Sequence, residues 1–163
     1  MSTEAAKLVS DLRLRPGSNL LVVGDVGPQA LEALAEAVGG LENILLLHRE
    51  PEPPIWAQRL TDRGLRARRS MVLEHNDFLA TSSFDAVLAQ DVLHRLLGKR
   101  EFLNEAYRLL KPGGRASIIQ RLWPLTSLRR GEFRKLLEKV RSYTPVESRI
   151  GIFSAYVVLE RPA

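Results

Sequence analysis

The chain has 163 residues, of which 45% are hydrophobic and 26% are charged, and its net charge at pH 7 is +5. This length and composition predict one globular domain with a sizeable core. Disulfides and thiolate metal sites are excluded because there is no cysteine, and the scattered histidines (His48, His75 and His94) argue against a zinc site, so no metal is expected. Residues 1–12 lack a signal-peptide pattern and no apolar run approaches the roughly 20 residues of a membrane span, which favours a cytoplasmic protein with no membrane partner.

The positive charge is concentrated in two segments. Residues 59–69 contain five Arg and one Asp, and residues 121–141 contain seven Lys or Arg and two Glu. Basic helices are most often solvated faces, and the alternative is contact with an anionic partner such as RNA, an acidic protein or a phosphorylated substrate. Both interpretations stay open from the sequence.

Short apolar runs alternate with segments of helical periodicity along the chain. After a lead-in over residues 1–18, residues 20–23 (LLVV) predict a buried strand, and residues 28–38 predict a helix with Pro28 in its first turn. Further strands are expected at residues 43–47, 70–73, 85–89, 116–119, 145–150 and 155–160. Further helices are expected around Trp56 and Leu60, over residues 101–110, and over residues 131–141.

This order predicts an α/β fold: a doubly wound, Rossmann-like sheet of seven mostly parallel strands with helices on both faces. One domain is expected over residues 1–163, with an N-terminal helix in residues 1–18 and the core in residues 19–163. The gap between residues 150 and 155 is too short for a crossover helix, so the last strand should be antiparallel. Open sheets of this kind bind ligands beyond the carboxyl ends of the strands, where the strand order reverses.

Two segments carry a resemblance to a known family. Residues 84–94 (FDAVLAQDVLH) resemble the fourth-strand motif of class I S-adenosylmethionine-dependent methyltransferases of the ubiquinone/menaquinone-biosynthesis type. Residues 105–117 (EAYRLLKPGGRAS) resemble the helix, Lys-Pro-Gly-Gly turn and fifth strand of the same family, although that turn is explained by helix termination alone. The resemblance covers roughly residues 10–161 and implies S-adenosylmethionine as cofactor.

The first loop departs from the family pattern, which has an acidic residue in the first strand and then three glycines near the cofactor's carboxylate. Gly24 matches the first glycine, whereas Val26 and Pro28 stand where the second and third are expected. A side chain at Val26 would crowd the cofactor, and its β-branch resists a positive φ. Asp25 and Gly27 are the residues that would supply the missing acid and the flexibility.

The resemblance assigns further cofactor contacts near the second and third strands. The family's ribose-binding acid falls on His48, so Glu50, two residues later, is the candidate ligand of the ribose hydroxyls, because a carboxylate can accept from both. Asp77 matches the acid that contacts the adenine amino group, with Phe78 packing on the ring. The alternatives are a partner-facing His48 and an Asp77 that caps a solvated turn.

After the fourth strand, Gln90 and Asp91 are expected beside the methionine portion of the cofactor, and His94 is a weak candidate for a general base. Methyl transfer needs little from the protein beyond alignment of nucleophile, methyl group and sulfur. Residues 121–130 are a short insert that leaves no substrate lid. A homo-oligomer or large partner is therefore expected to cover the open site, and the substrate is an unknown small molecule or protein.

Three functions compete. The leading hypothesis is a minimal S-adenosylmethionine-dependent methyltransferase. The second is a non-catalytic methyltransferase-like module that has lost cofactor binding and acts as a scaffold. The third is a nicotinamide-dependent oxidoreductase, since residues 24–30 fit a G-x-x-G-x-x-A pattern after a strand, but no Tyr-x-x-x-Lys pair accompanies it.

Overall fold

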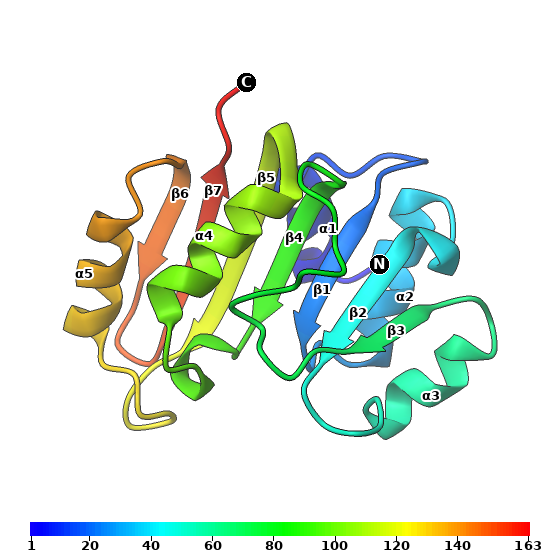
Figure 1. The fold of residues 1–163 in the computed structure, drawn as a ribbon, viewed down its shortest axis with the longest axis horizontal. Helices are drawn as coiled ribbons and strands as arrows, with labels where there is room; N and C mark the ends of the chain where they lie inside the picture. Colours follow the sequence, from blue (N-terminus) through cyan, green and yellow to red (C-terminus); the bar gives the residue numbers. More distant parts are fainter.

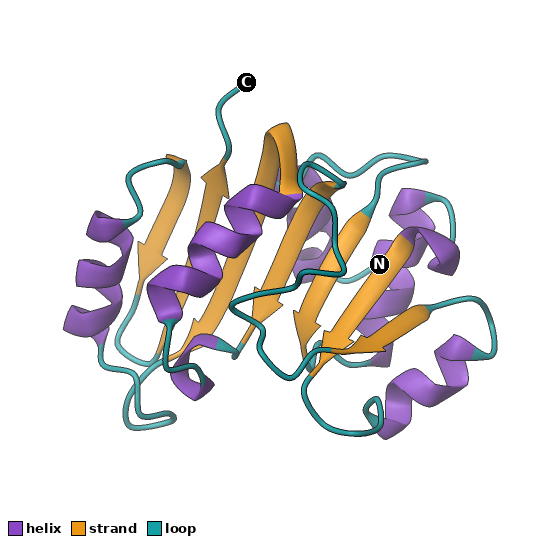
Figure 2. Cartoon of the chain, in the orientation of Figure 1, coloured by secondary structure: helices purple, strands orange, loops and turns teal.

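In the computed structural model, which describes residues 1–163, seven strands form one sheet in the order β3-β2-β1-β4-β5-β7-β6 (Figures 1 and 2). Its strands are β1 (Leu20–Gly24), β2 (Ile44–His48), β3 (Arg66–Arg69), β4 (Phe84–Gln90), β5 (Leu110–Arg121), β6 (Thr144–Ile150) and β7 (Ser154–Glu160).

Strand directions follow the predicted pattern. β1 to β5 pair in parallel, whereas β7 is antiparallel to both β5 and β6. The expected mixed, doubly wound sheet with an antiparallel last strand is confirmed. β1 lies between β2 and β4, so the strand order reverses there, and Figure 1 shows the arrowheads of these three strands at the same lower edge of the sheet.

Helices cover both faces of this sheet. They are α1 (Thr3–Asp11), α2 (Pro28–Val38), α3 (Ile55–Thr61), α4 (Lys99–Leu109) and α5 (Arg130–Lys139), with short 3-10 turns η1 (Leu41–Asn43) and η2 (Leu93–Arg95). One apolar cluster joins the sheet to α4 and α5, and a second joins it to α1, α2 and α3. Side chains of a strand alternate between the two faces, and β1 accordingly sends Leu21 and Val23 into the first cluster and Leu20 and Val22 into the second. Because both faces are covered, this strand is an unbroken apolar run.

The third strand lies four residues earlier than expected. Residues 70–73 attracted the prediction because they are apolar, but the strand that pairs with β2 is Arg66–Arg69, of which only Ala67 is partly buried. A strand at the sheet edge gains its stability from backbone hydrogen bonds, and arginine side chains there discourage pairing with another chain. Of the predicted run, Met71 and Val72 are exposed, and Leu73 is buried beside the ligand cavity described below.

The two basic segments lie at opposite ends of the sheet. Residues 59–69 form part of α3, the following turn and β3, whereas residues 121–141 run from the end of β5 through α5, beside β6 and β7 (Figure 1). They therefore form no continuous basic surface, and an anionic partner would meet one or the other. None of the helices has the length and apolar character that crossing a membrane requires.

Candidate functional site

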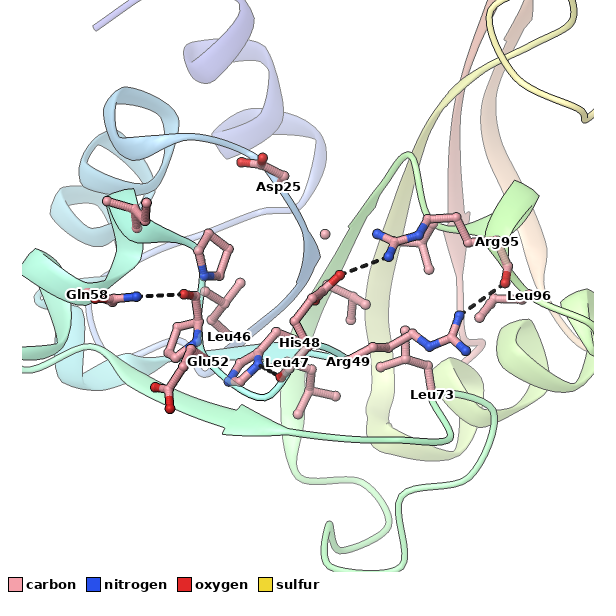
Figure 3. A pocket seen from close by; sticks show the side chains of 17 residues that line it. Asp25, Leu46, Leu47, His48, Arg49, Glu52, Gln58, Leu73, Arg95 and Leu96 are labelled. Atoms are coloured by element: carbon pink, nitrogen blue, oxygen red, sulfur yellow. Dashed lines mark hydrogen bonds and ion pairs between the residues drawn. The ribbon is translucent and has the colours of Figure 1, made fainter.

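A cavity of about 450 Å³ opens at the carboxyl ends of β1 and β2, where the strand order reverses (Figure 3). This volume is in the range of small-molecule sites. Its walls come from the end of β1, the end of β2 with the loop that follows and the start of α3, the loop after β3, and the turn after β4. The lining residues used below are Gly24, Asp25, His48, Glu50, Glu52, Leu73, Arg95 and Leu96.

Gly24 ends β1 at a point where no side chain fits. It has a φ of +107°, and a Cβ built on it would lie 2.1 Å from the carbonyl oxygen of Gln90. The backbones of β1 and β4 therefore approach each other closely at the base of the cavity, which places Gly24 in its wall. Gly27 also has a positive φ, +82°, but no atom lies within 4 Å of its ideal Cβ position. Conformation alone accounts for glycine at that residue.

Val26 does not enter the cavity, contrary to the crowding expected from the sequence. Its side chain packs against the apolar cluster shared by α1, α2 and α3. Its φ is not positive, so the β-branch causes no backbone strain. Together with Gly27, it lines a separate hollow of about 960 Å³ between α1 and the start of α2. Gln90 lines both this hollow and the polar recess described below. The side chain turns toward the core because an apolar group gains more by burial there than at the polar mouth of the loop.

A Val26→Gly substitution is therefore expected to leave the affinity for a ligand in the cavity unchanged within a factor of two. It should lower the free energy of unfolding by roughly 1–2 kcal/mol, because buried apolar surface is lost and the loop gains freedom. Calorimetric titration and urea unfolding measure the two effects. A tenfold gain in affinity would contradict this placement of the valine.

Asp25 connects the first loop to α3. The Nε1–H of Trp56 donates to its carboxylate at 2.5 Å, and the Gln90 Nε2 donates to its backbone carbonyl at 3.4 Å. The loop is thus held by groups from α3 and from the end of β4. Trp56 had been expected only as a helix residue, since nothing in its sequence neighbourhood indicates a contact 31 positions away.

The segment after β2 places a carboxylate at the cavity wall. His48 is buried, and its Nδ1–H donates to the carbonyl of Glu50 at 2.8 Å, which fixes the turn. The Glu50 Oε1 accepts from the Nη2 of Arg95 at 2.8 Å, and the hydrogen bond and charge of this arginine hold the pKa of Glu50 below its usual value. Figure 3 shows Arg49 and Arg95 on the same side of the cavity, where the Arg49 guanidinium donates to the Arg95 carbonyl. Backbone N–H groups of Arg49 and Glu50 also lower the pKa of this carboxyl group, so Glu50 is ionised at neutral pH.

A polar recess of about 510 Å³ adjoins the cavity. It has no apolar lining residue, and it shares Gly24, Asp25 and Arg95 with the cavity. Its remaining walls are Gln90, Asp91, His94 and Arg121. A ligand with an apolar ring at one end and a charged group at the other would place the ring in the cavity and the charged group in the recess.

Asp91 is committed to a partner within this recess. Its backbone has a φ of +53°, a conformation that Asp tolerates better than most residues. Its carboxylate accepts from both the backbone N–H and the Nε of Arg121, at 2.7 and 3.0 Å. The end of β4 is thereby tied to the end of β5. Asp91 thus lines the recess as part of an ion pair, and its contact with the methionine portion of the cofactor stays a prediction.

Asp77 and Phe78 do not line the cavity or the recess. Both are exposed, and the guanidinium of Arg68 lies over the Phe78 ring at 3.9 Å. Leu73 occupies the cavity wall instead, because the chain turns after β3 and the buried Asn76 fixes that turn through its hydrogen bond to the Leu73 carbonyl. An adenine contact from Asp77 or Phe78 stays a prediction, one that would need this loop to move.

The fold and the site define a class of protein: a doubly wound sheet with a cofactor-sized cavity at its switch point. The chain belongs to the methyltransferase domain family, whose model matches residues 7–116. This family uses S-adenosylmethionine, and membership favours methyl transfer over the nicotinamide hypothesis. No curated protein sequence matches the chain.

Solved structures share this fold at low sequence identity. A SAM-dependent methyltransferase from Aquifex aeolicus is 19% identical with a TM-score of 0.76, covering 97% of this chain and 89% of that chain. The 1,6-didemethyltoxoflavin-N1-methyltransferase of Burkholderia thailandensis, solved with bound 1,6-didemethyltoxoflavin and S-adenosylhomocysteine, is 21% identical with a TM-score of 0.71, covering 98% of this chain and 76% of that chain. The [4+2]-cyclase SpnF is 16% identical with a TM-score of 0.78, covering 98% and 80%. At these identities the likeness concerns the fold.

Proposed function

We propose that this chain binds S-adenosylmethionine across the cavity and the polar recess and transfers its methyl group to an acceptor at the recess. The observation that carries the proposal is the junction of the two compartments at Gly24, Asp25 and Arg95, on the switch point of the sheet. The absence of a side chain at Gly24 lets the backbones of β1 and β4 approach closely at the base of the cavity. The motifs at residues 84–94 and 105–117 support the narrower placement beside the ubiquinone/menaquinone-biosynthesis type.

The chain's own residues match the parts of this cofactor. Leu73 and Leu96 give the cavity apolar walls suited to a purine. Glu50 has an ionised, half-exposed carboxylate in the cavity wall, which suits a ribose diol. Gln90 and Asp25, which line the recess, suit the amino-acid portion. When bound, the sulfonium supplies an activated methyl group, and the protein's task is to align the acceptor and exclude competing water.

Titration calorimetry tests this function. We expect heat from S-adenosylmethionine and from S-adenosylhomocysteine and none from NAD. Glu50→Gln should weaken binding about tenfold, because a neutral amide accepts less strongly from the hydroxyls. Glu52→Gln is the matched control, since Glu52 also lines the cavity but makes no hydrogen bond, and its affinity should stay within a factor of two. Equal losses in both variants would contradict the role of Glu50.

The second candidate is a scaffold that binds no cofactor, and it is favoured by an ion pair that already occupies the Glu50 carboxylate. The carboxylate of Glu50 is already paired with Arg95 across the cavity. Against the scaffold, this ion pair is half exposed, so water screens it and a ligand can replace it at little cost in free energy. A folded protein that gives no heat with any of the three ligands would support the scaffold.

The homodimer expected from the missing lid remains part of the proposal. Exposed apolar side chains beyond the carboxyl end of β5 support it: Trp123 and Leu125 after β5, and Ile152 and Phe153 in the β6–β7 turn. The two loops are joined by the hydrogen bond from the Leu122 N–H to the Phe153 carbonyl. Light scattering at micromolar protein concentration measures the mass. A monomer would contradict the homodimer, and a different partner protein would then have to cover the site.

A further inference from the structure

Gln120 lies fully buried beneath the recess, and its amide orientation is fixed by the backbone. Its Oε1 accepts from the N–H of Leu93 at 3.1 Å, and its Nε2 donates to the carbonyl of Arg121 at 2.8 Å. A backbone N–H can only donate and a carbonyl can only accept, so the oxygen and nitrogen of this amide cannot be exchanged. The second Nε2–H points at the Nδ1 of His94, 3.0 Å away.

This contact sets the proton on the His94 ring. Because Gln120 donates, Nδ1 must accept with its lone pair, and the proton of the neutral imidazole lies on Nε2. If Nδ1 were protonated, its N–H would face the Nε2–H of Gln120, and two donors would oppose each other. Turning the amide to relieve that conflict would break both backbone hydrogen bonds of a residue that has no access to water.

The Nε2–H of His94 is free to meet a ligand. His94 lines the recess, and its Nε2 has no hydrogen-bond partner within the protein. The charged groups around the ring are Asp91, Arg95, Lys99 and Arg121. Burial and the three cations lower the pKa of His94, and they outweigh the opposing charge of Asp91, so the ring is neutral at pH 7.

We propose that Gln120 holds His94 as a hydrogen-bond donor, and that the acceptor substrate is an oxygen that arrives as an anion, a carboxylate or an enolate-type oxygen. This inference rests on the proposed methyl transfer. Nε2 carries a proton and therefore cannot take one, and both carboxylate oxygens of Asp91 are held by Arg121. His94 is therefore not the base that an alcohol or an ammonium group would need.

An anionic oxygen needs no base. It accepts from the His94 Nε2–H with one lone pair and forms its bond to the methyl carbon with another, while the carbon–sulfur bond breaks and sulfur keeps that electron pair. The acceptor becomes a neutral ester or ether, the sulfonium becomes a neutral thioether, and no proton is released. Arg95 and Arg121 line the same recess and favour an anion before the reaction.

Long-range proton–nitrogen NMR of the uniformly labelled full chain tests the tautomer without cofactor. His94 signals, assigned by their loss in His94→Gln, should show Nδ1 unprotonated and Nε2 protonated at pH 7. His48 is the internal contrast, because its Nδ1–H donates to the Glu50 carbonyl and its Nδ1 should therefore be protonated. Nδ1 protonation of His94, or a charged ring at pH 7, would overturn the inference.

Two further measurements address Gln120 and the acceptor class. Gln120→Glu should move the His94 proton to Nδ1 and raise its pKa, while His48 stays unchanged; an unaltered His94 would show that Gln120 does not set the tautomer. Benzoate should shift the His94 Nε2 signal and benzyl alcohol should not, and benzoate should bind His94→Leu at least fivefold more weakly. An equal response to both probes would overturn the anionic acceptor. Failure to bind S-adenosylmethionine would instead sink the proposed function and leave these spectra unaffected.

Discussion

Gly24→Ala is expected to produce the largest effect of any single methyl group added to this chain. The new Cβ would lie 2.1 Å from the Gln90 carbonyl oxygen and 3.0 Å from a methyl of Val92, at a backbone φ of +107°. Backbone strain and a clash with main chain both oppose it, so the free energy of unfolding should fall by about 4 kcal/mol or more. Because β1 and β4 must separate to admit the methyl group, binding at the cavity should be lost as well.

Urea unfolding with parallel ligand titration checks this expectation, and Gly27→Ala provides the matched control. Gly27 has a similar φ, +82°, with nothing within 4 Å of the added Cβ, so it carries the strain without the clash and should cost about 1–3 kcal/mol. If the two variants lose equal stability, the close approach of β1 and β4 is not what requires glycine. Gly131→Ala, in the first turn of α5 with open space around it, should fold at least as well as the parent chain.

The second large effect is expected at Glu105, a carboxylate on α4 that is only 6% exposed. It accepts from the Arg108 Nε at 2.7 Å, from the Arg108 Nη2 at 2.9 Å, and from the Asn76 backbone N–H at 2.7 Å. Glu105→Ala leaves these donors without their carboxylate and should cost about 3 kcal/mol. The loop between β3 and β4, which carries Leu73 of the cavity wall, should also become more mobile in hydrogen exchange.

Acid unfolding gives an independent test of the same carboxylate. Burial acts to raise the pKa of Glu105, but the hydrogen bonds from Arg108 and Asn76 outweigh it and hold the pKa below the usual 4.5. Its contribution to stability is therefore fully present above about pH 4.5 and is lost as the pH falls through the lower folded-state pKa. Glu105→Gln should be less stable at pH 7 and should lose less on acidification. Glu101→Gln, at an exposed site on the same helix, should change stability by at most about 1 kcal/mol; an equal loss there would remove the special role of Glu105.

The sequence predicted those elements whose side chains meet the core. The range 28–38 for the second helix agrees with the structure, because Leu31, Leu34 and Val38 recur at helical spacing and Gly39 ends it with a φ of +91°. The β3 prediction was wrong because an edge strand is held by backbone pairing with β2, which leaves no apolar pattern. Apolar periodicity reports burial, and it does not report hydrogen bonding at an edge.

For the site, local sequence fixed which residues follow each strand, and strand topology then determined that Gly24, Asp25, Glu50 and Gln90 would gather at one edge. Only the tertiary structure decided where their polar groups point. The pairing of Glu50 with Arg95, the contact of Trp56 with Asp25 and the hydrogen bond from Gln120 to His94 join residues 26 to 45 positions apart. Such contacts depend on the packing of several elements at once, so no single segment of the sequence contains the information that determines them.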